Sequence, residues 1–233
     1  MKLSSFIKTG AAALMLASAV SHATGMVPET SVIIVEQSDG EGSVNVTNTD
    51  SYPVLMLSTL KAVPEDKANL LTLTPPAARV EAGKTQRVRF LMTDKTPLTT
   101  EHLMRVTFEG VPPQKKDQNI VRMGFRQNLP VIIRPAGLAK DEAPWKGLVW
   151  KQSGSTLTVS NPSPYVVRME QKVQTLPDNA TWTMDGTYVL PGQTRTLSLD
   201  KKGAAAGSAR QVRIAPATTW GYSVQSYDAP LTH

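Results

Sequence analysis

The stretch "NIVRMGFRQNLPVIIRP", residues 119–135, places two apolar strand patterns on either side of a proline. Val121, Met123 and Phe125 occupy alternate positions, so a β-strand would turn all three side chains toward one face. Pro130 then interrupts the strand, because proline has no backbone N–H to donate to a ladder. Since proline is tolerated mainly at sheet edges and bulges, the pattern predicts a strand that ends its pairing at the edge of a sheet, or a simple bulge, and the two are compatible.

Short strands separated by turns recur through the rest of the chain. Its 233 residues include 17 prolines and 15 glycines, scattered between runs rich in valine and threonine, while helical periodicity is weak. About seven short strands in each half, with turns roughly every ten residues, predict an all-β chain with two immunoglobulin-like β-sandwich domains in tandem. The candidate strands cover residues 31–37, 42–48, 52–63, 72–92, 101–113 and 119–135, then 148–152, 155–161, 165–175, 181–184, 187–190, 193–199, 210–215 and 220–227.

The N-terminus has the pattern of a secretory signal peptide. Lysines precede the short apolar run "AAALMLASAV", and Ser21 and Ala23 occupy the −3 and −1 positions of a cleavage site. We therefore assign residues 1–23 to a signal peptide. The loop-like segment "AGLAKDEAPWKG" then separates a first domain, residues 24–135, from a second, residues 136–233.

These features predict export to the periplasm as a chain that is not embedded in the membrane. After residue 23 no apolar run approaches 18 residues, the length that a membrane-spanning helix needs. The chain contains no cysteine, so an exported form would have no disulfide framework. With 40% hydrophobic residues, the chain can stabilise its domains by burying apolar side chains instead.

Charge and motif content argue against nucleic-acid binding and against catalysis. Without the signal peptide the chain has 23 basic and 19 acidic residues, with no basic block interleaved with aromatics. Only His102 and His233 remain as histidines, and the sequence has no Gly-x-Ser-x-Gly elbow, phosphate-binding loop or dinucleotide fingerprint. We therefore expect a protein that is not an enzyme and that has no catalytic residues, cofactor or metal site.

Five collinear motifs, spread over most of the chain, resemble one known family. They are "LTPPAARVEAGKTQRVRF" (73–90), "FEGVPP" (108–113), "VIIRP" (131–135), "VSNPSPYVV" (159–167) and "YVLPGQTRTLSL" (188–199). This set is similar to the motifs of the PapD-like periplasmic pilus-assembly chaperones of the chaperone–usher pathway. The resemblance implies two immunoglobulin-like domains in a boomerang-like arrangement.

The resemblance also implies a mechanism and its partners. Chaperones of this family lend a strand to an incomplete pilin subunit and deliver the subunit to an outer-membrane usher. Such donor-strand complementation is a form of β-strand addition. It would make Val121, Met123 and Phe125 the side chains that enter the subunit. The other interpretation of the alternation is that these side chains face their own domain's core. An exposed edge strand could also pair with a second copy of the chain.

The chain departs from the family where its members hold the C-terminal carboxylate of the subunit. The family's two basic positions correspond here to Ser31, in "SVII", and to Pro130, in "LPVIIRP". The resemblance is therefore to a divergent, archaic or alternate branch. Because a buried carboxylate needs a charged partner, we consider Arg105 the first candidate for a substitute anchor and Arg134 the second. An exposed strand arginine and an interdomain ion pair are the respective alternatives.

A second interpretation of the whole chain is an exported structural or carbohydrate-binding adhesion module made of two immunoglobulin-like domains. A sugar-binding protein should display clustered, exposed aromatic side chains. The four tryptophans Trp145, Trp150, Trp182 and Trp220 are spread through the second half of the sequence, and we expect them in the core or at the domain junction.

Overall fold

The computed structural model describes residues 25–113, 125–201 and 209–233. The predicted signal peptide and two of the predicted donor-strand residues, Val121 and Met123, lie outside the described residues. The described part contains nineteen strands and one short 3-10 helix, joined by turns and loops. Their bounds are β1 Met26–Pro28, β2 Ile33–Glu36, β3 Glu41–Asn48, β4 Val54–Ala62, β5 Leu71–Thr74, β6 Ala77–Val80, β7 Thr85–Met92, β8 His102–Val111, β9 Arg126–Arg134, η1 Pro144–Gly147, β10 Val149–Ser153, β11 Thr156–Ser160, β12 Val167–Met169, β13 Lys172–Leu176, β14 Thr181–Thr183, β15 Tyr188–Val189, β16 Thr194–Lys201, β17 Gln211–Ile214, β18 Pro216–Ala217 and β19 Tyr227–Thr232.

The first nine strands form the two layers of a sandwich that β2 links. The pairing order is β5-β7-β3-β2-β9-β8-β4-β6, with β1 on β3. Strand β2 pairs in parallel with the end of β9 but meets β3 only at Glu36 and Glu41. The N-terminal strand therefore changes layers between β1 and β2, and this change decides how much of β9 is covered.

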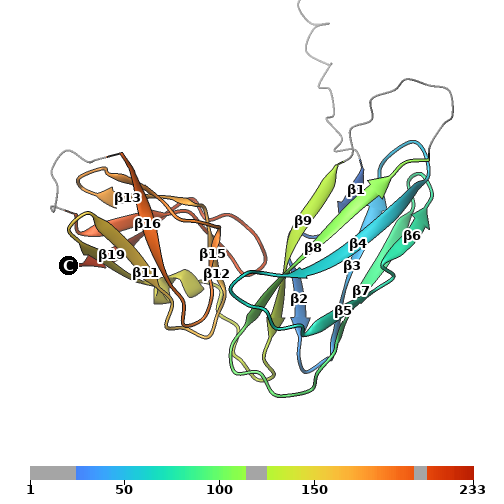
Figure 1. Ribbon diagram of the computed structural model, residues 1–233, viewed down its shortest axis with the longest axis horizontal. Coiled ribbons are helices and arrows are strands. Elements are labelled where there is room, and N and C mark those ends of the chain that lie inside the picture. Colours follow the sequence, from blue (N-terminus) through green and yellow to red (C-terminus); the bar gives the residue numbers. More distant parts are fainter. Residues whose placement is uncertain (1–24, 114–124, 202–208) are drawn as a thin grey trace, which may run out of the picture.

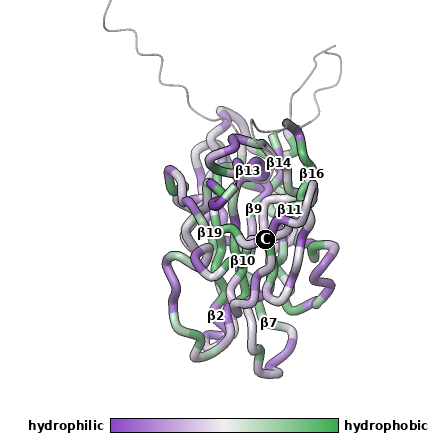
Figure 2. Tube along the Cα trace, turned by 90° about the vertical axis from the view of Figure 1, so that its left-hand side faces the viewer, coloured by the Kyte–Doolittle hydropathy of each residue, from purple (hydrophilic) through white to green (hydrophobic). Residues whose placement is uncertain are grey.

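The second domain closes on itself. Strands β10, β11, β16, β14, β13, β17 and β19 form a closed barrel, and β15, β12 and β18 form a small sheet beside it. Figure 2 views the molecule toward this domain and shows apolar and polar segments alternating along the tube. Among the described residues no helix has the length and apolarity needed to cross a bilayer.

A buried asparagine organises the same turn in both domains. Asn48 Nδ2 donates to the carbonyls of Tyr52 and Val80, at 2.9 and 3.0 Å. Asn161 Nδ2 donates likewise to the carbonyls of Tyr165 and Val189, at 2.7 and 3.0 Å. Each amide thus ties a turn to a distant strand. The "NPSPY" motif consequently has a structural role in the second domain.

The two lobes meet at an angle (Figure 1), across a small apolar junction. Val32, Leu103 and Ile132 of the first domain pack there with Val166 and Leu190 of the second. This cluster is separate from the two larger domain cores. The predicted all-β fold with two immunoglobulin-like sandwiches is confirmed.

Candidate functional site

Strand β9 carries an open edge in the first domain. Along its whole length β9 pairs with β8, from Arg126 opposite Glu109 to Ile133 opposite His102. On the other side β2 pairs only with residues 131–134. In the described part of the chain no strand forms a ladder with this side of residues 126–130. Unpaired edge groups of this kind are a template for an added strand.

The row of β9 side chains that faces the domain core continues past the end of that core. Val131 and Leu129, on this row, are 0% and 6% exposed, and Leu129 lies opposite the buried Val106. Gln127 is partly buried opposite Phe108. Phe125, two residues earlier in the same alternation, is 51% exposed. The apolar row therefore leads out of the sandwich toward solvent.

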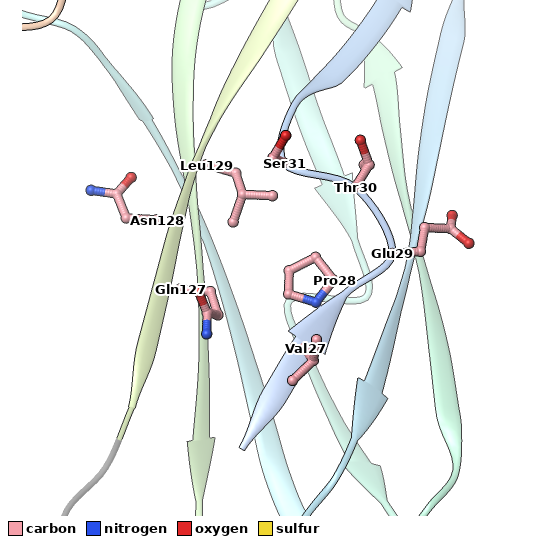
Figure 3. A pocket seen from close by; sticks show the side chains of 8 residues that line it. All are labelled: Val27, Pro28, Glu29, Thr30, Ser31, Gln127, Asn128 and Leu129. Atoms are coloured by element: carbon pink, nitrogen blue, oxygen red, sulfur yellow. The ribbon is translucent and has the colours of Figure 1, made fainter. Parts of the chain in front are cut away.

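A groove of about 440 Å³ runs beside this open edge. Figure 3 shows its two walls: β9 on one side, and β1 with the segment that follows it on the other. The side chain of Leu129 points into the gap toward Pro28, and Asn128 lies on the far face of β9. Since β1 pairs with β3 and not with β9, the groove separates two strands that a further strand could bridge.

Of the three predicted donor side chains, Phe125 alone is described. Because Phe125 is half exposed, it does not fill the core of its own domain, which was the alternative interpretation. Its exposure is consistent with a side chain that a bound subunit could bury. The roles of Val121 and Met123 stay predictions, because both lie outside the described residues.

Arg105 lies in a cleft between the domains. It projects from β8 directly across the ladder from Pro130, and it binds Asn128 through Nε to Oδ1 and Nη2 to the carbonyl oxygen, both at 2.9 Å. A pocket of about 430 Å³ at this place is lined by Arg105, Lys61 and Tyr188, among others, and by no acidic residue of the described chain. Burial lowers the pKa of Arg105.

A second arginine that was not predicted from the sequence, Arg168, lies close enough to Arg105 for their charges to interact. It comes from β12 in the second domain, and its Nη2 donates to the carbonyls of Thr218 and Thr219, at 2.8 and 3.3 Å. Burial, together with the nearby charge of Arg105, lowers the pKa of Arg168 to about 10. Neither arginine forms a salt bridge within the described ranges. Nothing in the sequence distinguishes Arg168 from other arginines on strands. Its proximity to Arg105 depends on how the two domains pack.

Unlike Arg105, Arg134 is buried between two carboxylates, so its prediction as a second anchor is wrong. Its side chain is 2% exposed and lies between two carboxylates: Nε is 3.1 Å from Glu101 Oε1, and Nη1 is 3.1 Å from Glu36 Oε1. Glu101 Oε2 also accepts the amide of Val166 from the second domain, at 2.8 Å. Arg134 is therefore part of an interdomain ion-pair network and is not free to bind an external carboxylate.

Ser31 has a structural reason for its small size. Gly221 of the second domain packs onto it so closely that a Cβ at position 221 would overlap the Ser31 hydroxyl and lie 2.8 Å from Val32 Cγ2. Neither Ser31 nor Pro130 can supply a positive charge, whereas Arg105 carries one directly across the ladder from Pro130, and Arg168 lies within reach of the Arg105 charge.

A tandem of immunoglobulin-like domains with an uncovered sheet edge and a basic interdomain cleft defines the class of protein. The family models agree with this class. Residues 25–139 match the N-terminal domain of the PapD pili and flagellar-assembly chaperones, and residues 143–226 match the C-terminal domain of the PapD pili assembly chaperones. The chain belongs to this family and is a pilus-assembly chaperone.

Individual relatives support this assignment. The fimbrial chaperone YhcA of Escherichia coli K12, itself uncharacterised, is 43% identical over 90% of this chain and 92% of its own length. MrkB of Klebsiella pneumoniae, a chaperone protein, is 28% identical over 66% of this chain and 71% of its own.

Solved structures agree in fold. The YadV chaperone superposes with a TM-score of 0.73 at 23% identity, over 89% of this chain and all of that one. A structure of the Salmonella enterica SafA pilin with the SafB chaperone matches with a TM-score of 0.72 at 22% identity, over 91% and 98% of the two chains.

Proposed function

We propose that this chaperone works in the periplasm by adding β9 and the residues before it to an incomplete pilin subunit, which it then delivers to an outer-membrane usher. One observation carries the proposal: the core-facing row of β9 leads out of its own domain beside an open ladder edge. A complex between a pilin and a chaperone of the same fold is known for SafA and SafB. The proposal involves binding and transfer, without catalysis.

The open edge and the apolar row would contribute in different ways. Backbone hydrogen bonds along the edge contribute affinity whatever the sequence of the paired strand, while the alternating side chains set the register. Burying a large apolar side chain contributes about 1.5–3 kcal/mol relative to leaving it exposed. Phe125 is half exposed, so a subunit core could still bury much of its surface, and Val121 and Met123 would extend the row in the same alternation.

We assign the terminal carboxylate of the subunit to Arg105 and Arg168. Both guanidinium groups are partly desolvated, and neither forms a salt bridge among the described residues, although the charge of Glu101 favours the charged form of Arg168. Arg168 is destabilised in its charged form by Arg105, so a bound anion would relieve the repulsion between the two. Charge-assisted hydrogen bonds from arginine to a carboxylate are among the strong polar contacts in proteins.

The strand assignment is tested by co-expression with pilin subunits encoded near this protein. The wild-type chain should give a 1:1 complex on size exclusion, and the double variant Met123→Asp/Phe125→Asp should lose it, because charges cannot enter an apolar core. Val149→Asp is the matched control, since Val149 is also 50% exposed but lies in the second domain. Complex formation by the double variant at wild-type strength would refute the strand assignment.

The anchor is tested separately with Arg105→Ala and Arg168→Ala. Each should weaken the complex about tenfold or more, an effect of about 1.4 kcal/mol. A pilin extended by two residues at its C-terminus should bind the wild-type chain equally weakly, because its carboxylate is displaced. If both variants bind normally, the anchor is wrong while the strand assignment stands.

A further inference from the structure

The loop between β18 and β19 is held rigid by its own polar groups. The amides of Thr218 and Gly221 donate to the carbonyls of Tyr222 and Thr218, both at 2.8 Å, and the amide of Tyr222 donates to Thr218 Oγ1 at 3.1 Å. Thr219 Oγ1 donates to the Asp141 carbonyl at 2.9 Å. This loop, residues 218–222, is thus a preformed element of the second domain.

The same loop touches the first domain at the end of the open groove. Gly221 lies against Ser31 and Val32, and Ser31 also lines the groove beside β9. Glycine is required there for two reasons: its φ is +88°, and a side chain would overlap Ser31. The loop therefore borders the place where an added strand would reach the domain junction.

The loop nevertheless exposes two aromatic side chains. Trp220 is 49% exposed and Tyr222 is 73% exposed, so Trp220 lies in the loop beside the domain junction and not in the core. The other three tryptophans, Trp145, Trp150 and Trp182, are 6%, 1% and 2% exposed, as expected for core residues. Tryptophan and tyrosine are enriched among the residues that dominate the binding energy of protein interfaces.

The loop is also connected to the basic cleft. Its Thr218 and Thr219 carbonyls hold the guanidinium of Arg168, which in turn feels the charge of Arg105. Lys140 Nζ lies 5.7 Å from the centre of the Trp220 ring and adds another positive charge. The loop that carries the two aromatic side chains thus contacts Arg168 and borders the end of the open groove. A chain that ends in a carboxylate after apolar residues has the complementary chemistry.

We propose that Trp220 and Tyr222 form a subsite for the side chains that immediately precede the C-terminal carboxylate of the bound pilin, and that this contact discriminates among subunits. The inference rests on the proposed function. It adds a determinant of specificity in the second domain to the strand edge and the arginines. Because the loop is already ordered, a matching subunit gains apolar contact without the cost of ordering it.

Tryptophan fluorescence gives a direct test, because Trp220 is the one tryptophan of the four with substantial exposure. The probe is a pilin recovered in complex with the wild-type chain, with any tryptophan of its own replaced by phenylalanine. Acrylamide quenching of the free chaperone should come mainly from Trp220 and should fall at least twofold in the complex. Quenching that is unchanged in a complex shown to be 1:1 would overturn the proposal.

Affinity measurements show whether the contact matters. Trp220→Ala/Tyr222→Ala should weaken pilin binding about tenfold or more, whereas Tyr52→Ala, which removes another exposed aromatic side chain, should leave it within twofold. A second pilin would have glycine at the three positions before its C-terminal residue. The wild-type chaperone and the double variant should bind this pilin with equal affinity. Thermal unfolding at the wild-type temperature would verify that the variants are folded.

The outcomes separate the two proposals. If the wild-type chain binds no pilin, the proposed function fails. If it binds and the double variant binds equally well, only the aromatic subsite fails. Protection of Trp220 by soluble oligosaccharides and not by the pilin would overturn the subsite and favour a sugar-binding surface.

Discussion

At the residue scale, the pair of Arg134 and Glu101 shows how one motif can suggest the wrong role. The arginine of "VIIRP" suggested an anchor, but its side chain lies with Glu101 in an almost water-free junction. Burial is the largest influence on Glu101 and raises its pKa, although the Val166 amide and Arg134 oppose it. Removing the arginine would leave a buried carboxylate without its cation.

We therefore expect Arg134→Ala to destabilise the protein by about 3–5 kcal/mol, the range for breaking a buried ion pair by removing one partner. Urea denaturation monitored by circular dichroism would measure the change in the free energy of unfolding. The exposed pair of Arg79 and Glu81 supplies the control, since surface ion pairs contribute about 0–1 kcal/mol. An Arg134→Ala variant as stable as Arg79→Ala would contradict this account.

Asn161 belongs to a motif that was recognised correctly from the sequence, but its structural role was not apparent there. The "NPSPY" motif was recognised by resemblance, and the spacing of its residues says nothing about what the asparagine binds. The structure shows that its amide ties the turn at Tyr165 to Val189, as Asn48 does in the first domain. A motif can therefore be identified from the sequence while its physical role depends on a strand 28 residues away.

At the scale of the element, β9 combines a covered half and an open half. Residues 131–133 lie between β2 and β8 and Arg134 pairs with β2, whereas residues 126–130 pair with β8 alone. The predicted edge strand is thus open where the donor function needs it and closed next to the domain junction. Pro130 lies at the boundary between the open and the covered half of β9. The ladder with β2 begins one residue later, at Val131, so the missing N–H of Pro130 removes no bond from it.

Hydrogen exchange should report this difference. In the free protein, those amides of residues 126–129 that point away from β8 should exchange quickly, and residues 131–134 slowly. Binding of a pilin should slow exchange in the first segment and leave the second unchanged, because only the open half gains a ladder. Mass spectrometry of overlapping peptides measures both segments in one experiment. Equal protection of the two segments in the free protein would show that the edge is already covered.

The same open edge predicts self-association. A second copy of the chain could pair with residues 126–130 when no subunit is present, since no described strand of the first domain pairs with the edge that faces away from β8. Analytical ultracentrifugation should show a dimer that Phe125→Asp and the bound pilin both reduce. A strictly monomeric free protein over a wide concentration range would exclude this pairing.

At the scale of the whole molecule, polar contacts join the domains beside the apolar junction. Glu65 of the first domain accepts Tyr188 Oη and Arg195 Nη2 of the second, both at 2.6 Å. Burial tends to raise the pKa of Glu65, but the hydrogen bond from Tyr188 and the charge of Arg195 outweigh it, so this pKa lies below 4.5. Burial and Glu65 raise the pKa of Tyr188 to about 12.

The angle between the domains should therefore depend on acid pH. A carboxyl whose pKa is depressed by folding stabilises the folded arrangement above its usual pKa, and this contribution is lost as the pH falls through the depressed value. Small-angle scattering should show a fixed domain arrangement at neutral pH and a looser one well below pH 4.5. Glu65→Gln should be looser already at pH 7 and respond less to acid. Identical profiles for the variant and the wild type would rule out this contact as the cause.

The all-β class, the two sandwiches and the family could be predicted from the amino-acid sequence, because alternation, turn residues and collinear motifs are local properties of the chain. The sequence also indicated that residues 119–135 form an edge strand, since Pro130 restricts where such a strand can lie. Which charged groups lie next to each arginine depends on the folded structure. Arg134 is enclosed by Glu101 and Glu36, and Arg168 reaches Arg105 from the other domain. Burial and charge pairing depend on distances between residues far apart in the chain, which no spacing in the sequence records.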